Sequence, residues 1–218
     1  MLPLKHHSMD KNHYSDIEEW LSVASHVLGA MFSIVGLVLL INKATTLHSS
    51  FAAWVYGLSL CAMFVSSSIY HLEKDAARRA IFRKIDHIAI YFLIAGSYTP
   101  LLLISVEGWI ASAGLLVIWL VAFAGITFKL LLGHRFPKVS IITYAIMGWM
   151  ALFAIYPIYL SVPFGGFVLL LAGGLCYSAG IPLYLLKSRH YSHAIWHVCV
   201  VAGAACHFFL MYLYVYAV

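Results

Sequence analysis

The stretch "GWIASAGLLVIWLVAFAGITFKL", residues 108–130, contains a single charged side chain, Lys129, close to its end. An α-helix needs about 20 predominantly apolar residues to cross the hydrocarbon core of a bilayer. The stretch therefore predicts a transmembrane helix. The rest of the chain has the same character, because 63% of its 218 residues are hydrophobic and only 10% are charged. Soluble domains average about 25% charged residues, so this composition excludes the soluble class.

Seven stretches of this kind follow one another along the sequence. They cover roughly residues 20–42, 50–72, 82–104, 108–130, 138–160, 164–186 and 192–216. We therefore predict an all-α membrane protein in which a short tail, residues 1–17, precedes one transmembrane domain of seven helices, residues 18–218. Because the predicted loops are short, neighbouring helices are expected to be adjacent and antiparallel.

The distribution of lysine and arginine predicts the orientation of these helices. One side of the membrane receives the N-terminal tail and the second, fourth and sixth loops, with the following basic residues: Lys5, Lys11, Lys74, Arg78, Arg79, Arg83, Lys84, Lys129, Arg135, Lys138, Lys187 and Arg189. The other side receives Lys43 alone. Since cytoplasmic loops carry the excess of basic residues, we expect a cytoplasmic N-terminus and an external C-terminus.

Charge, cysteine content and the N-terminus exclude several other classes. The net charge of +5 comes from basic residues scattered over short loops, which is not the pattern of a nucleic-acid-binding face. The cysteines lie in apolar runs without CxxC spacing and are interpreted as small buried hydrophobes: Cys61, Cys176, Cys199 and Cys206. The start "MLPLKHHSMD" lacks the apolar core of a signal peptide, and its "HHSM", typical of an expression scar, is set aside.

Metal-binding residue types gather at the predicted cytoplasmic ends of three helices. His71 ends the second span, Asp86 opens the third, and His193 and His197 open the seventh. The last two are four residues apart, so both imidazoles lie on one helix face and can bind one ion. Three neutral imidazoles leave one tetrahedral position for water, which is the arrangement of catalytic zinc. Zinc lowers the pKa of such a water to about 7, and Asp86 is placed to hold and deprotonate it.

Other polar residues share helix faces near this set. Ser67 lies four residues before His71, on the same face of the second span, and is a candidate catalytic residue beside Asp86. On the first span, which begins with Glu18 and Glu19, a further polar face is predicted to support the metal ligands from behind. Its members are Glu19, Ser22 and His26.

Each of these residues also has a simpler interpretation. An HxxxH pair arises by chance fairly often in a chain with 12 histidines. Asp86 is suited to cap the third helix, Ser67 to bond to its own helix carbonyl, and Glu19 to be solvated. His207 lies off the metal-binding face and is expected to be a packed polar residue. Solvated positions at the interface are expected for His87, His134 and His190. The combination still favours function, because ionisable groups within spans are costly.

At these residues the chain resembles the hemolysin III family, the bacterial branch of the progestin and adipoQ receptor superfamily. The likeness extends from about residue 18 to the end. It is carried by "SSSIYH" (66–71), "KIDHIAIYFLIAGSYTP" (84–100), "YAIMGW" (144–149), "AGGLCYSAGIPLY" (172–184) and "HAIWHVCVVAGAACHF" (193–208). The resemblance implies a seven-helix fold with a cytoplasmic N-terminus, here in a bacterial cytoplasmic membrane.

The resemblance also implies a chemistry. The superfamily's Ser-x3-His, Asp and His-x3-His pattern corresponds to Ser67, His71, Asp86, His193 and His197. In the receptor branch the three histidines bind zinc, the aspartate contacts the zinc water, and the implied activity is hydrolysis of ceramide-like amides. On the first helix, receptors favour Glu, Asn and His, whereas this chain has a serine in place of the asparagine.

The leading hypothesis is an intramembrane zinc hydrolase that acts on a lipid amide or ester near the cytoplasmic leaflet. A pore-forming cytolysin with structural zinc is an alternative, although its polar residues should run the full length of a span. A b-type haem carrier with histidine ligands is another alternative. A receptor-like sensor that uses the same zinc site is the fourth.

Overall fold

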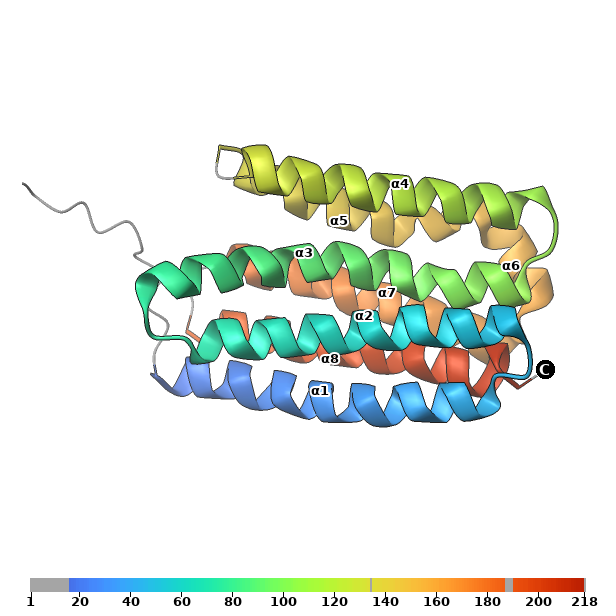
Figure 1. Ribbon diagram of the computed structural model, residues 1–218, viewed down its shortest axis with the longest axis horizontal. Helices are drawn as coiled ribbons and strands as arrows, with labels where there is room; N and C mark the ends of the chain where they lie inside the picture. Colours follow the sequence, from blue (N-terminus) through green and yellow to red (C-terminus); the bar gives the residue numbers. More distant parts are fainter. Residues whose placement is uncertain (1–15, 134, 187–189, 218) are drawn as a thin grey trace, which may run out of the picture.

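The computed structural model describes residues 16–133, 135–186 and 190–217. Within these residues seven helical segments are long and apolar enough to cross a membrane, as the sequence predicts (Figure 1). The helices are α1 (Asp16–Lys43), α2 (Leu47–Leu72), α3 (Ala76–Pro100), α4 (Trp109–Leu132), α5 (Pro137–Trp149), α6 (Ile155–Ser161), α7 (Phe164–Leu185) and α8 (Ser192–Leu210). Short turns of π-helix extend α3 (Leu101–Ser105) and α8 (Met211–Val215), and a 3-10 turn (Met150–Ala154) joins α5 to α6.

The helices form a closed ring. Helix α1 packs against α2 and α8, α2 against α3, α3 against α4 and α5, and α7 against α5 and α8. Because successive spans are antiparallel, the start of α1, the end of α2 and the starts of α3 and α8 lie at the same end of the bundle, on the left of Figure 1. We call this end the site end.

The outer surface of the ring is apolar. Phe32, Trp109 and Phe153 are 72%, 78% and 90% exposed. The interior is filled by other large side chains, among them the fully buried Tyr56 and Tyr91. Exposed apolar surface of this extent is unfavourable in water and is matched by a lipid environment. The distribution therefore agrees with seven membrane-spanning segments.

The start of α3 differs from the sequence-based prediction of residue 82. The helix begins at Ala76, and the Asp75 side chain accepts a hydrogen bond from the backbone N–H of Arg78 at 2.9 Å. Alanine and arginine are good helix formers, so polar turns extend the helix beyond its apolar part. Of the basic residues assigned to the second loop, Lys74 lies there, and four lie on α3 instead: Arg78, Arg79, Arg83 and Lys84.

The fifth span, predicted as one helix over residues 138–160, is interrupted between α5 and α6. Pro157 has no backbone N–H, so the helical hydrogen bond to the carbonyl four residues earlier cannot form there. At the interruption the Tyr98 hydroxyl accepts from the Ala151 backbone N–H at 2.7 Å and donates to the Met147 carbonyl at 2.9 Å. Tyr98 thereby satisfies backbone groups that lipid would leave unpaired.

Several predictions concern residues outside the described part of the chain. They are the tail up to residue 15 with Lys5, Lys11 and the "HHSM" stretch, His134 in the fourth loop, and Lys187 and Arg189 in the sixth. The cytoplasmic location of the N-terminus therefore stays a prediction from the distribution of basic residues.

Candidate metal centre

Three buried histidines meet at the site end. His71 belongs to the last turn of α2, and His193 and His197 belong to the first two turns of α8. The Nε2 atom of His193 lies 3.2 Å from Nε2 of His71 and 3.0 Å from Nε2 of His197. The candidate ligand atoms of all three residues lie within 4.8 Å of one another. The structure thus brings together the residues that the sequence proposes as metal ligands.

The spacing and donor type of this cluster fit one metal ion. Zinc binds imidazole nitrogen at about 2.0–2.1 Å in tetrahedral geometry, which places neighbouring nitrogens about 3.4 Å apart. The two measured separations, 3.2 and 3.0 Å, are close to this value. Three imidazoles from two helices also leave one position open, which distinguishes catalytic from closed structural zinc sites.

The first turn of α1 supports the cluster through two consecutive glutamates. The Nδ1 atom of His71 lies 2.6 Å from a carboxylate oxygen of Glu19, whose other oxygen forms an ion pair with Arg79 on α3. The backbone N–H of His193 donates to Glu18 at 3.2 Å. A carboxylate on Nδ1 fixes the tautomer in which the Nε2 lone pair of His71 is available to a metal.

The rest of the predicted polar face of α1 is buried, and its His26 lies against the same cluster. Ser22 and His26 are 0% and 1% exposed. The His26 ring lies with its centroid 3.9 Å from that of His197, and it packs edge-on against Phe64. The sequence prediction missed Glu18. Its position beside Glu19 could have indicated its role, because adjacent residues of a helix point about 100° apart and so reach different neighbouring helices.

Asp86 does not cap α3. The N-cap is Asp75, and Asp86 lies three turns inside the helix, where it is buried. The capping interpretation of Asp86 is therefore wrong. The Ser67 hydroxyl is hydrogen-bonded to the Asp86 carboxylate. By contrast, the neighbouring Ser66 and Ser68 donate to helix carbonyls three and four residues earlier, at 3.1 and 2.8 Å.

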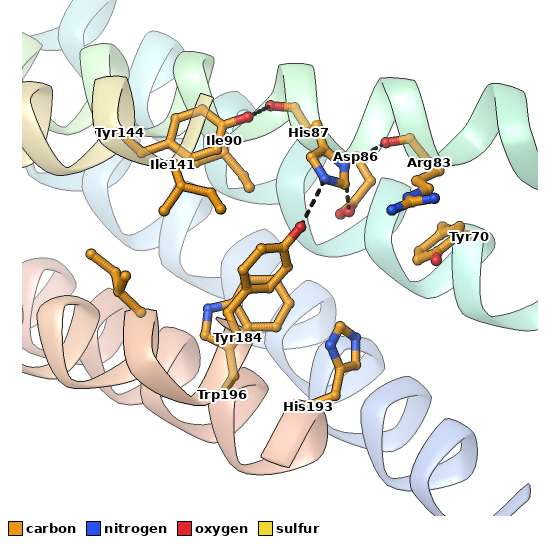
Figure 2. A pocket seen from close by; sticks show the side chains of 11 residues that line it. Tyr70, Arg83, Asp86, His87, Ile90, Ile141, Tyr144, Tyr184, His193 and Trp196 are labelled. Atoms are coloured by element: carbon orange, nitrogen blue, oxygen red, sulfur yellow. Dashed lines mark hydrogen bonds and ion pairs between the residues drawn. The ribbon is translucent and has the colours of Figure 1, made fainter. Parts of the chain in front are cut away.

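A cavity at the site end separates Asp86 from the histidine cluster. Figure 2 shows the Asp86 carboxylate on α3 and the His193 imidazole on α8 at opposite walls of this entrance cavity. Its lining consists of Tyr70, Arg83, Asp86, His87, Ile90, Ile141, Tyr144, Ile181, Tyr184, His193 and Trp196. A carboxylate and an imidazole of the candidate metal centre thus line the same cavity.

A second, deep cavity adjoins the first and extends toward the middle of the bundle. The two share Asp86, Ile90, Tyr144, Ile181 and Trp196 as lining residues. Most of the deep cavity's remaining wall is apolar or aromatic side chains of α3, α5, α7 and α8, and its empty volume, including the space at its mouth, is about 1010 Å³. An apolar space of this kind, with a few polar groups in its wall, is typical of a site for a largely apolar ligand.

The remaining histidines are divided between the cavities and the surface. His87, predicted to be solvated, is only 13% exposed at its side chain and lies 2.7 Å from the Arg83 carbonyl and 3.3 Å from the Tyr184 hydroxyl (Figure 2). That prediction was wrong because α3 begins earlier and carries His87 deeper than expected. His207 is a packed polar residue as predicted, with Nε2 3.3 Å from a carbonyl of α7. His190 is exposed, also as predicted.

Comparison with known proteins supplies relatives over most of the chain. The family model described as "Haemolysin-III related" matches residues 14–208. The chain is 40% identical over 201 residues to "Hemolysin-3" of Bacillus cereus, which covers 91% of this chain and 92% of the relative. It is 37% identical over 203 residues to "Hemolysin-3 homolog" of Bacillus subtilis (strain 168), covering 90% and 94% respectively.

A eukaryotic protein is also related. "Monocyte to macrophage differentiation factor" of Homo sapiens is 31% identical over 200 residues, covering 88% of this chain and 82% of the relative. The chain is an integral membrane protein, and the bacterial relatives together with the seven apolar helices place it in the bacterial cytoplasmic membrane.

Proposed function

The chain belongs to the hemolysin III family, and from this premise and the geometry of its site we propose that it is an intramembrane zinc hydrolase acting on a lipid amide or ester. The observation that carries the proposal is the convergence of three buried Nε2 atoms beside a cavity whose opposite wall bears a buried carboxylate. Ionisable groups at such depth in a membrane bundle are costly and usually functional.

In this proposal His71, His193 and His197 hold the ion, and Glu19 fixes the orientation of His71. When bound, zinc supplies an acidified water and a Lewis acid for a carbonyl group. The protein's own contribution is a preformed arrangement, because the imidazole nitrogens already lie 3.0 and 3.2 Å apart and are buried. Little reorganisation is then needed when substrate arrives.

Asp86 is assigned to proton transfer. Its carboxylate accepts the proton of the attacking water and returns it to the nitrogen or oxygen of the leaving group, as a general base and then a general acid. Ser67, hydrogen-bonded to Asp86, orients the carboxylate toward the entrance cavity. Ser67 shares α2 with the ligand His71, and Asp86 lies on α3, which packs against α2, so the acid–base group and this ligand are held by one packed unit.

The deep cavity suits the hydrocarbon part of a lipid. Its apolar wall begins at Asp86 and leads toward the middle of the bundle, so an acyl chain lying there would present its carbonyl group near the site end. The distribution of basic residues predicts that this end faces the cytoplasmic leaflet. We therefore assign the reaction to lipids of that leaflet.

The name of the bacterial relatives refers to haemolysis, which suggests a pore as the second interpretation. A pore requires a continuous polar path along the span, whereas the deep cavity in the middle of this bundle has a largely apolar wall. A receptor-like sensor would use the same metal site without turnover. Hydrolysis, measured together with metal content, separates these alternatives.

The test of the function is Asp86→Asn in detergent-purified protein. We expect the variant to retain its zinc, measured by elemental analysis, while hydrolysis of a short-chain ceramide falls by at least about a hundredfold, within the usual range for a general base. Asp75→Asn is the matched control: the same change on the same helix, at a cap where asparagine serves equally well. His71→Ala should lose both zinc and activity.

Unchanged turnover in the Asp86 variant at full zinc occupancy would refute the assigned role. A wild-type protein that contains zinc but hydrolyses no lipid amide or ester would favour the sensor interpretation. A wild-type protein without zinc would refute the metal site.

A further inference from the structure

Three arginines lie on the first two turns of α3, and their surroundings differ. Arg78 forms an ion pair with Glu73 at 3.2 Å, and Arg79 pairs with Glu19. The guanidinium of Arg83 forms no ion pair or hydrogen bond with any residue in the described part of the chain, although its side chain is half-buried. It instead lines the entrance cavity, where Figure 2 shows it on α3 near Asp86 and Tyr70.

A second cation adds to the positive charge around Arg83, although it lines neither cavity. Lys129, in the last turn of α4, is half-buried and interacts electrostatically with both Arg83 and Asp86. Two like charges held together at partial burial repel each other unless an anion lies between them. Asp86 provides one negative charge deeper in the cavity, where Ser67 already bonds to it. The pair of cations therefore has capacity for a further anionic group from outside the chain.

The surroundings of Arg83 favour a phosphate group. A guanidinium presents a planar fork of donors that matches two phosphate oxygens, and it retains its charge at any physiological pH. The hydroxyl-bearing side chains Tyr70 and Tyr184 line the same cavity and can add neutral hydrogen bonds. A lipid with its acyl chain in the deep cavity would carry its headgroup toward these residues.

We propose that Arg83 binds the phosphate ester of a lipid headgroup at the entrance cavity, and that the preferred ligands are acyl amides or esters that bear a phosphate. The inference rests on the proposed function for the identity of the lipid as substrate. The site itself requires only binding, so it can be tested without turnover.

Lys84 provides the control that separates a built site from general attraction to anionic membranes. It follows Arg83 on α3 and is exposed, and it lines neither cavity. Arg83→Gln and Lys84→Gln each remove one positive charge from the site end. A long-range effect on anionic lipids should therefore be the same in both variants.

The experiment compares binding of short-chain ceramide 1-phosphate with binding of the same ceramide without the phosphate, by native mass spectrometry of detergent-purified protein. We expect wild type and Lys84→Gln to bind the phosphorylated lipid about tenfold or more tightly than the neutral one, as a charge-assisted bidentate contact implies. Arg83→Gln should lose this preference. Lys129→Gln should weaken the preference less than Arg83→Gln does, because Lys129 lines neither cavity.

The remaining arms decide between sources of phosphate. Inorganic phosphate at millimolar concentration should displace the phosphorylated ceramide only weakly, since it lacks the acyl chain. If inorganic phosphate binds as tightly as the phosphorylated ceramide, the site is one for free phosphate and the lipid assignment is overturned. Equal loss of preference in the Arg83 and Lys84 variants would reduce the effect to surface charge and also overturn it, as would a wild-type protein without preference. A clear preference in a protein without hydrolytic activity would sustain the binding site and refute the hydrolase.

Discussion

The contact between Glu19 and His71 makes a graded prediction about metal affinity. Glu19 accepts from His71 Nδ1 at 2.6 Å with one carboxylate oxygen and pairs with Arg79 through the other. Glu19→Gln keeps an oxygen that can accept from the imidazole but removes the charge and the ion pair with Arg79. Glu19→Ala removes the acceptor as well. Metal affinity should therefore fall in the order wild type, glutamine variant, alanine variant.

The magnitude follows from the position of Glu19 behind the candidate ligand His71. Loss of the carboxylate that orients a metal-bound histidine typically costs about 10–100-fold in affinity, which is about 1.4–2.8 kcal/mol. The side chain of Glu19 is 20% exposed, so its charge is only partly screened by solvent. We expect about tenfold weaker zinc binding for the glutamine variant and a loss approaching a hundredfold for the alanine variant.

The assay is a competition titration of detergent-purified protein against a zinc chelator of known affinity. Glu73→Gln serves as the control, because Glu73 lies at the same end of the bundle and pairs with Arg78 but forms no hydrogen bond or ion pair with a histidine of the described residues. The Glu73 variant should titrate like wild type. If the two glutamine variants titrate alike, Glu19 does not support His71 and the reasoning from its 2.6 Å contact fails.

Two further predictions concern the helices that carry the site. Tyr98→Phe removes the hydroxyl that bonds Ala151 and Met147 at the break in the fifth span. The variant should be about 1–3 kcal/mol less stable than wild type and should have a lower Tm in detergent. Tyr159→Phe, at an exposed tyrosine, is the control, and equal Tm values for the Tyr98 and Tyr159 variants would contradict the prediction. In a cysteine-free background, an impermeant thiol reagent should label Glu107→Cys in intact cells and Arg78→Cys only after lysis, whereas the reverse pattern would invert the predicted orientation.

The sequence was sufficient to predict that the three histidines lie close together. Seven apolar stretches and alternating direction place the end of the second span and the starts of the third and seventh at one end, so His71 and the His193–His197 pair had to approach one another. The i, i+4 spacing of that pair then put both rings on one helix face. The same reasoning predicted that His26 lies beside the cluster, and its ring does pack against His197.

The sequence was less informative where helices continue through polar residues. Hydropathy detects only the part of a helix that lies in hydrocarbon, so it could not show that α3 continues outward to Ala76. The shift moved Arg78 and Arg79 from a presumed loop onto helical turns and placed His87 inside the cavity wall. The carboxylate partners of individual basic side chains depend on helix rotation, which a single sequence does not specify.

The same polar turns of α3 explain how the site is held. Two of their side chains act in different directions: Arg79 reaches α1 through Glu19 and so supports His71 from outside the cavity, whereas Arg83 lines the cavity itself. If these two arginines lay in a loop, the positions of their side chains would not be fixed. The carboxylate of Glu19, which contacts His71, would then lack its ion pair with Arg79. The helical extension therefore joins α1, α2 and α3 at the site end. It follows that a helix-breaking change there, such as Ala80→Pro, should weaken zinc binding as much as loss of Glu19 does, although Ala80 contributes no polar side chain of its own.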